Sequence, residues 1–555
     1  MNKLYDSLKD LLPFGAKPWS SPSLERMDYG PTGNNAAMIQ FFTWNSCADG
    51  SSWWKHFEEH IPRLSAMGFT RVWLPPPNKD GHPQGRGYGA YDLWDLGEFD
   101  QRGATRTRWG TRDEFVQACI VAKNHGVEVI IDAVLGHKVG ADRAEKCMAV
   151  EVHPDNRMKK IGPRKEIEAY TSFEFPGRGD KYSSLKWNHN HFSGVDYDRS
   201  TRKRGIYYIE GPRRKFWSDH VDKENGNYDY LLGADIDHRQ PDVRDDMLSW
   251  GVWILQTTGA SGFRFDAIKH YDRRFLKEFL RKTRKETGND KLLAIAEAWT
   301  TDYSRLSPYI RDFEGQMAFF DVPLHYNLHE ASKPNSDPDL RKILRNSILE
   351  KRPGDAVTFV DNHDTQIGQT LESWVHKSFK VQSYALILLH GHGFPCVFYG
   401  DLFPNEECYD AETAAQLEQL LGFRKLYAYG DTTEYFNYRN CIGFVRSGTN
   451  DRTGCAVVIR SSAAKSVVIY LLSVSVLKIK SLRQKSQAKS TTYYGEEIKM
   501  RVGSQANYRD LLGDPREVAV SPDGWGVFPC RVGRVSVWVA TSEGEPSDYF
   551  GILPS

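Results

Sequence analysis

Three carboxylates follow apolar, strand-like segments of this chain. Asp266 follows GFRF, Glu297 follows LLAIA, and Asp364 lies in FVDNHDT. A carboxylate at the end of a buried strand is costly unless it is paired or functional, so each of the three is a candidate catalytic group. A structural cap or ion pair explains any single one equally well. Three on separate strands favour nucleophilic and acid–base chemistry.

Basic side chains accompany two of these carboxylates. Arg264 precedes Asp266 by two residues, so both side chains should point to the same side of a strand. We expect the guanidinium to keep the Asp266 carboxylate ionised, with a low pKa. His137 ends another strand-like segment and His363 is adjacent to Asp364. A single histidine is more often structural, but two at strand ends are better interpreted as donors to substrate hydroxyls.

The segments that must position these groups alternate between strand-like and helix-like patterns. A parallel sheet with helical crossovers is therefore expected, and eight strands fit a (β/α)8 TIM barrel, whose catalytic groups come from the C-terminal strand ends. The predicted strands cover residues 37–42, 70–76, 127–135, 262–268, 292–299, 316–322, 356–362 and 395–400.

Breaks in this alternation predict the domain organisation. We expect an inserted domain after the third strand and a C-terminal antiparallel β-domain, because short strand-like runs replace the helices after about residue 430. The predicted units are an N-terminal extension (1–35), the barrel (36–137 and 236–430), the insertion (138–235), the C-terminal domain (431–545) and a tail (546–555). Residues 476–495 are basic, Ser-rich and atypical, and are either a solvated loop or an error in the gene model.

Composition excludes several classes of partner. The chain has 555 residues with 73 Lys+Arg against 72 Asp+Glu, a net charge of +1, which gives no electrostatic reason to bind nucleic acid or an anionic membrane. No apolar run is long enough to span a bilayer. The eight cysteines are scattered without a C-x-x-C pair. We therefore expect a cytoplasmic monomer with neither a nucleic-acid nor a membrane partner.

The segments DAVLGHK, GFRFDAIKH, IAEAW and FVDNHDT resemble, in this order, the signature regions of the alpha-amylase family of retaining glycoside hydrolases. The similarity runs from about residue 36 to 545 and is greatest to bacterial liquefying-type alpha-amylases and their intracellular fungal relatives. It implies that Asp266 is the nucleophile, Glu297 the general acid/base and Asp364 a third, substrate-binding carboxylate. It also implies a substrate-binding set of Tyr88, His137, Arg264, Lys269, His270 and His363.

This resemblance implies an endo-acting, retaining hydrolase of α-1,4-glucosidic bonds in starch, glycogen or maltooligosaccharides. One alternative is a 4-α-glucanotransferase that uses the same residues, since Ala298 stands where the family has a Tyr on the leaving-group side. A non-catalytic glucan-binding protein is a second alternative, which the retained carboxylates disfavour.

The resemblance also implies calcium between the barrel and the insertion. Asp229, Asp235 and Asp237 match family ligand positions, and His270 offers its main-chain carbonyl, so a single calcium ion at a weakened site is one interpretation. Polar hydrogen bonding is the other. The multi-ion cluster is predicted to be absent, because family oxygen ligands are replaced by Gly136, Ser193, Ser218 and Arg239.

Overall fold

The computed structural model describes residues 35–47, 50–211, 216–462, 495–503 and 506–541. Apart from Asn35 and Gly495, the expected N-terminal extension, the atypical segment 476–495 and the C-terminal tail lie outside these ranges. No helix within them is both long and apolar enough to cross a bilayer.

Eight parallel strands close the barrel, in chain order around its circumference, and the last pairs with the first. The fold class and all eight predicted strands are confirmed. The strands are β1 (Ala37–Gln40), β2 (Phe69–Trp73), β5 (Glu128–Ala133), β13 (Gly262–Phe265), β14 (Leu293–Ala296), β15 (Ala318–Phe320), β16 (Ala356–Phe359) and β17 (Phe394–Phe398).

Helices follow the barrel strands and begin and end where the sequence has caps. Thr111 and Glu114 form a capping box at the start of α3, and Gly259 and Gly288 end α4 and α5 in left-handed conformations. The α-helices are α2 (Trp53–Ala66), α3 (Arg112–Asn124), α4 (Pro241–Thr258), α5 (Arg273–Thr287), α6 (Tyr303–Asp312), α7 (Val322–Ser332), α8 (Ile348–Lys351), α9 (Lys377–Leu389), α10 (Tyr399–Leu402) and α11 (Ala411–Tyr427). Short 3₁₀ helices cover His189–His191, Glu224–Gly226, Ile268–His270, Leu340–Lys342 and Pro353–Asp355.

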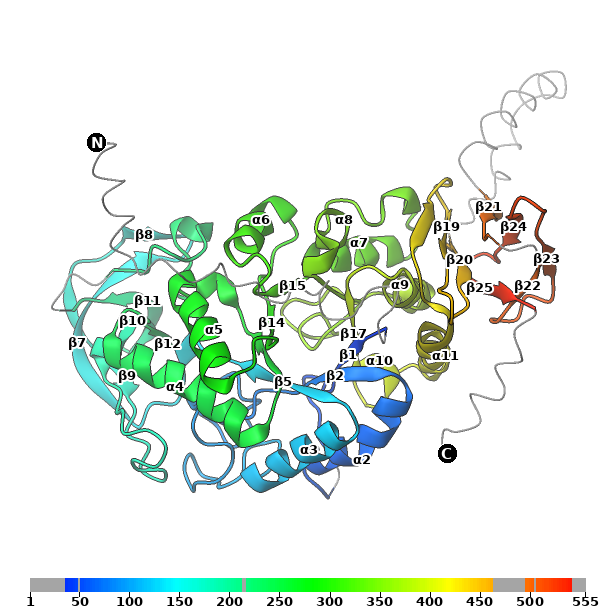
Figure 1. Ribbon diagram of the computed structural model, residues 1–555. Coiled ribbons are helices and arrows are strands. Elements are labelled where there is room, and N and C mark those ends of the chain that lie inside the picture. The colour runs from blue at the N-terminus through cyan, green and yellow to red at the C-terminus, as the bar shows by residue number, and fades with distance from the viewer. Residues whose placement is uncertain (1–34, 48–49, 212–215, 463–494, 504–505, 542–555) are drawn as a thin grey trace, which may run out of the picture.

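The insertion after β5 folds into an antiparallel sheet, whose strands sequence patterning alone did not predict. Figure 1 shows this sheet in cyan at one end of the molecule, beside α4 and α5. Its strands are β6 (His137–Lys138), β7 (Arg143–His153), β8 (Asn156–Lys160), β9 (Lys165–Ser172), β10 (Phe192–Asp198), β11 (Lys203–Ile209) and β12 (Ala234–Ile236). A small hairpin of β3 (Lys79–Asp80) and β4 (Ala90–Asp92) precedes it in the chain.

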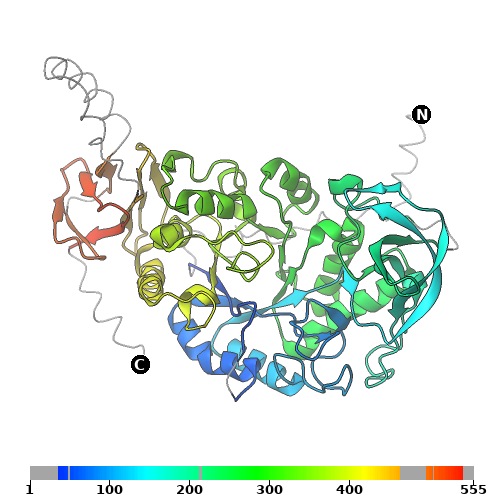
Figure 2. The same cartoon turned by 180° about the vertical axis from the view of Figure 1, so that it is seen from behind.

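The C-terminal part is antiparallel β structure, as predicted, and it forms two sheets at the end of the molecule opposite the insertion, which the view from behind also shows (Figure 2). The larger sheet contains β18 (Thr432–Tyr435), β19 (Cys441–Arg446), β20 (Cys455–Arg460), β25 (Val535–Ala540), β22 (Asn507–Asp510) and β23 (Glu517–Ala519). The smaller sheet pairs β21 (Glu497–Arg501) with β24 (Trp525–Pro529).

Aromatic side chains fill the barrel interior. Trp73 of β2 lies with its ring centroid 5.4 Å from that of Phe320, which in turn contacts Phe359 edge-on. The guanidinium carbon of Arg264 lies 4.8 Å from the centroid of Trp73. These apolar rings surround the arginine with a low dielectric constant, so its ion pairs are stronger than they would be in solvent.

Candidate active site

The three predicted carboxylates converge at the C-terminal ends of their strands, around Arg264. Arg264 Nη1 donates to Asp266 Oδ1 at 2.6 Å, and Nη2 donates to Glu297 Oε2 at 2.7 Å. The Asp266 and Glu297 carboxyl groups also hydrogen-bond to each other. Asp364 interacts electrostatically with both. The barrel therefore brings together the groups that the sequence places on three separate strands.

A fourth carboxylate, Asp132 of β5, belongs to the same cluster and was not among the predicted site residues. Asp132 Oδ1 accepts from Arg264 Nη1 at 2.9 Å, and its Oδ2 accepts from Trp73 Nε1 at 2.9 Å and Tyr88 OH at 2.8 Å. The sequence signal is an acid inside the apolar run VEVIIDAVL. The missing information was the strand pairing, which sets Asp132 directly opposite Arg264.

One guanidinium serves several buried carboxyl groups, and this controls their protonation. Burial raises the pKa of Asp266, against the opposing charge of Arg264, so the low pKa expected for Asp266 is wrong. Burial raises the pKa of Glu297 in the same way, as a general acid requires. Burial and the charge of Glu297 raise the pKa of Asp364 to about 8. Asp364 is therefore protonated near neutral pH, and burial favours the protonated forms of the other two.

The backbone after Asp266 is strained. Ala267 has φ 46° and ψ 48°, in the left-handed region that costs an alanine roughly 1–2 kcal/mol. In this conformation its N–H donates to Glu297 Oε2 at 3.0 Å, and the following Ile268 N–H donates to the Glu297 carbonyl at 2.9 Å. The strain thus helps to fix the carboxyl group of Glu297 against Arg264.

Three nearly parallel rings lie beside the carboxylates. Tyr88 stacks on His363 with centroids 5.2 Å apart, and Trp44 lies 6.0 Å from each of them. The Gln40 amide donates to His363 Nδ1 at 3.1 Å, which directs the Nε2–H of the neutral ring toward Asp364 Oδ2, 3.5 Å away. Burial, together with Arg264, lowers the pKa of His363 and keeps it neutral. Trp44 was missed, because its sequence context carries no distinguishing signal.

The loop that carries Tyr88 is held by a half-buried carboxylate. Asp80 Oδ2 accepts from the N–H groups of Gly87 and Gly89 at 2.9 and 3.0 Å, on both sides of Tyr88. Gly87 has φ +92°, and a Cβ there would lie 2.5 Å from the carbonyl oxygen of Pro76. Only glycine fits this position, so the loop fixes the tyrosine ring in place.

His137 supports the same loop. Its Nε2–H donates to the main-chain carbonyl of Tyr88 at 2.8 Å, and burial lowers its pKa. A neutral ring that donates through Nε2 keeps Nδ1 as an acceptor. The structure thus places His137 next to the Tyr88 backbone, with its donor used to position that loop.

Lys269 and His270 lie where the insertion meets the barrel. Lys269 Nζ pairs with Glu224 Oε2 at 2.5 Å and donates to the Trp299 carbonyl at 3.1 Å. His270 Nδ1 donates to the carbonyl of Tyr228 at 2.7 Å, and burial lowers its pKa to about 3. Contacts with the insertion therefore anchor both side chains, and Lys269 also links the insertion to the segment that follows β14.

A buried ion triad supports the segment that carries Asp364. Lys380 Nζ of α9 donates to Asp361 Oδ2 at 2.8 Å and to Asp401 Oδ1 at 2.9 Å. Asp361 Oδ1 also accepts from Thr365 Oγ1 at 2.9 Å, so the carboxylate ties both ends of the short segment around Asp364. One lysine thus links the ends of β16 and β17 beneath the site.

The predicted calcium ligands lie between the insertion and the barrel. Asp229 and Asp235 are buried, and Asp237 Oδ1 accepts from Arg239 Nε at 2.6 Å. Within the described residues, no group of three or more His, Cys, Asp or Glu side chains is arranged to hold a metal ion. The guanidinium of Arg239 therefore occupies a carboxylate oxygen of one of the predicted ligands.

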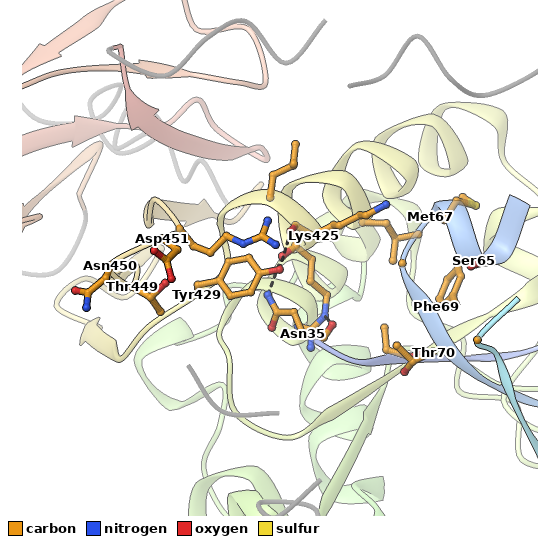
Figure 3. Close-up of a pocket in the computed structure, with 17 residues that line it drawn as sticks. Asn35, Ser65, Met67, Phe69, Thr70, Lys425, Tyr429, Thr449, Asn450 and Asp451 are labelled. Atoms are coloured by element: carbon orange, nitrogen blue, oxygen red, sulfur yellow. Dashed lines mark hydrogen bonds between the residues drawn. The ribbon is translucent and has the colours of Figure 1, made fainter. Parts of the chain in front are cut away.

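A pocket of about 760 Å³ lies at the opposite end of the barrel, where β1 and β2 begin (Figure 3). Asn35 Nδ2, on its wall, donates to the carbonyls of Arg424 and Ala428 at 2.7 Å each. None of the predicted catalytic residues lines it. The polar groups here serve the fold, and the candidate chemistry lies at the other end of the strands.

A pair of carboxyl groups is what most enzymes that cleave glycosidic bonds use, and this pair lies at the C-terminal end of the barrel, where TIM-barrel active sites lie. Fold and site together define a (β/α)8-barrel glycoside hydrolase.

Comparisons with known proteins identify the family. Residues 44–416 match the family described as Alpha amylase, catalytic domain, and the chain belongs to the alpha-amylase family. It is 40% identical to an alpha-amylase of Geobacillus stearothermophilus, over 91% of this chain and 87% of the relative. It is 35% identical to the cytoplasmic alpha-amylase of Escherichia coli, over 91% and 99% of the two chains. The crystal structure of an Anoxybacillus alpha-amylase shares the fold, with a TM-score of 0.58 at 16% identity, covering 96% of this chain and 100% of that one.

Proposed function

We propose that this alpha-amylase-type hydrolase is endo-acting and retaining, and that it cleaves α-1,4-glucosidic bonds in starch, glycogen or maltooligosaccharides. The observation that carries the proposal is the Arg264 guanidinium, which holds Asp266 at 2.6 Å and Glu297 at 2.7 Å. Carboxyl groups this close suit double displacement, since inverting enzymes separate theirs by about 6.5–9.5 Å to admit a water molecule.

In the first step, a carboxylate oxygen of Asp266 attacks the anomeric carbon of the bound glucan. The bond to the glycosidic oxygen breaks, and Glu297 transfers its proton to that oxygen as the shortened chain leaves. Burial raises the pKa of Glu297, which favours the protonated form that this step needs. The product of the step is a glycosyl ester on Asp266.

In the second step, the Glu297 carboxylate removes a proton from a water molecule, whose oxygen attacks the same anomeric carbon. The ester bond breaks and Asp266 is released as a carboxylate. Two inversions restore the α configuration. Arg264 stays paired with the two groups throughout and compensates the charge that moves between them.

Asp364 and the three rings are suited to binding the sugar at the cleaved bond. Tyr88 and Trp44 provide flat apolar surface, and His363 directs its Nε2–H to the same side as Asp364. With its pKa raised to about 8, Asp364 carries a proton near neutral pH and can donate it in a hydrogen bond to a sugar hydroxyl.

We also propose a cytoplasmic location. Cys119, Cys396, Cys441, Cys455 and Cys530 are buried, free cysteines. Unpaired thiols on this scale are typical of a reducing compartment. The E. coli relative is named as cytoplasmic, which supports the same proposal.

Incubation of the pure protein with maltoheptaose, followed by mass analysis of the products, tests the function. We expect only shorter maltooligosaccharides, because water resolves the glycosyl ester. Products longer than maltoheptaose would instead assign a 4-α-glucanotransferase. An unchanged substrate, with folding verified by circular dichroism, would overturn the catalytic assignment and leave a glucan-binding protein.

A further inference from the structure

Four buried aspartates gather where the insertion joins the barrel. Asp229 comes from the insertion, Asp235 from β12, Asp237 from the turn before α4, and Asp272 from the N-cap of α5. Their exposed fractions are 4%, 1%, 3% and 3%. Burying this much negative charge is costly unless a cation compensates it.

The chain itself supplies a cation at this position. Arg239 Nε donates to Asp237 Oδ1 at 2.6 Å, and its charge also acts on Asp229 and Asp272. The two Nη atoms donate to main-chain carbonyls of the insertion, Phe216 at 2.5 Å and Trp217 at 3.4 Å. One guanidinium thus joins carboxylates to carbonyl oxygens across the junction, which are the ligand types that calcium would join.

Each of the other three aspartates also accepts a hydrogen bond at a carboxylate oxygen. Ser218 donates its N–H to Asp229 Oδ2 at 2.7 Å and its hydroxyl to Asp272 Oδ2 at 3.0 Å. The Ser193 hydroxyl donates to Asp235 Oδ2. An oxygen that accepts a proton donor is less available to coordinate a metal ion, so these contacts favour the guanidinium arrangement.

The segment that follows the third barrel strand contributes no side-chain ligand at Gly136. A Cβ at this glycine would lie 2.6 Å from the ring of Tyr271. The Tyr271 hydroxyl accepts from the Leu135 N–H at 2.9 Å, which holds the ring in this space. A side-chain oxygen cannot enter from this position without displacing the tyrosine.

We propose that the guanidinium of Arg239 replaces a bound cation at this junction, so that the protein holds its insertion on the barrel without calcium. The proposal concerns stability and metal content, and it does not depend on which glucan the enzyme cleaves.

Metal analysis of the purified full chain, together with thermal unfolding in excess EDTA and in CaCl2, tests this proposal. We expect calcium well below one ion per chain and the same unfolding midpoint in both solutions. One tightly held calcium per chain, or a midpoint that EDTA lowers by several degrees, would overturn it.

Arg239→Gln provides the second test. Removing the guanidinium takes away the cation that pairs with Asp237 and acts on Asp229 and Asp272, so we expect a midpoint several degrees lower that added calcium partly restores. Arg199→Gln is the matched control, because Arg199 also pairs with a carboxylate of the insertion, Glu168 at 2.5 Å, but is 52% exposed. It should change neither the midpoint nor its response to calcium appreciably. Equal midpoints for Arg239→Gln and wild type would contradict the proposal.

Discussion

Arg264 and Asp132 lie directly opposite each other on the neighbouring strands β13 and β5, joined by a 2.9 Å hydrogen bond. Asp132 is thus the third carboxylate that pairs with Arg264, which also binds Asp266 and Glu297. Burial raises the pKa of all three carboxyl groups against the single positive charge of Arg264. The protonation of one carboxyl group therefore changes the pKa of the others.

Asp132→Asn should move the acid limb of the pH–activity profile to lower pH. The Asp132 charge contributes to raising the pKa of Asp266, and the nucleophile must be ionised to attack. Removing that charge lowers the pKa, and we expect a shift of about one pH unit. Asp142→Asn is the control, since Asp142 also accepts a tyrosine hydroxyl, from Tyr91 at 2.8 Å. An acid limb at the same pH in Asp132→Asn and in wild type would contradict the claim that Asp132 and Asp266 share Arg264.

Glu297→Gln should lower kcat by about 10²–10⁴-fold or more, because the amide cannot protonate the leaving oxygen. Affinity for maltoheptaose should be largely retained, which calorimetric titration can measure. Turnover close to the wild-type rate would remove Glu297 from its proposed role. A loss of binding as large as the loss of rate would show that the substitution disrupts the site as a whole.

Asp364→Asn should stabilise the protein at alkaline pH. The folded pKa of Asp364, about 8, is above its ordinary value of 3.8, so its stabilising contribution is complete below about pH 4 and is lost as pH rises through about 8. Asparagine does not titrate, so the variant does not lose this stability as the pH rises. The unfolding midpoint of the variant, relative to wild type, should therefore be higher at about pH 9 than at about pH 5. An equal difference at both pH values would contradict the raised pKa.

Lys380→Met should destabilise the fold by roughly 3–5 kcal/mol, because it leaves Asp361 and Asp401 buried without a cation. Denaturant unfolding measures this change. Lys333→Met removes an exposed pair with Glu330, with side chains 49% and 61% exposed, and should cost at most about 1 kcal/mol. Similar losses for both variants would show that the triad does not support the site.

The barrel was predictable from sequence because its strands are short apolar runs between capped helices. The insertion sheet was not, since its strands lie in a polar segment in which burial depends on partners far along the chain. Ile206 pairs with Val152, for example, across a long sequence separation.

The same contrast holds within the site. Asp266, Glu297 and Asp364 end recognisable strands, so their convergence followed from the barrel. Asp132 lies inside a strand, and its role required knowledge of the strand register. The direction of the Asp266 pKa was mispredicted for a related reason, because the local pattern showed Arg264 but not the other carboxylates that share it.

Proton NMR of the first product formed from maltoheptaose tests the central claim most directly. Double displacement by Asp266 and Glu297 predicts that the newly formed reducing end appears first as the α anomer and then mutarotates. Initial appearance of the β anomer would mean a single inversion, and would contradict the assignment of Asp266 as the nucleophile.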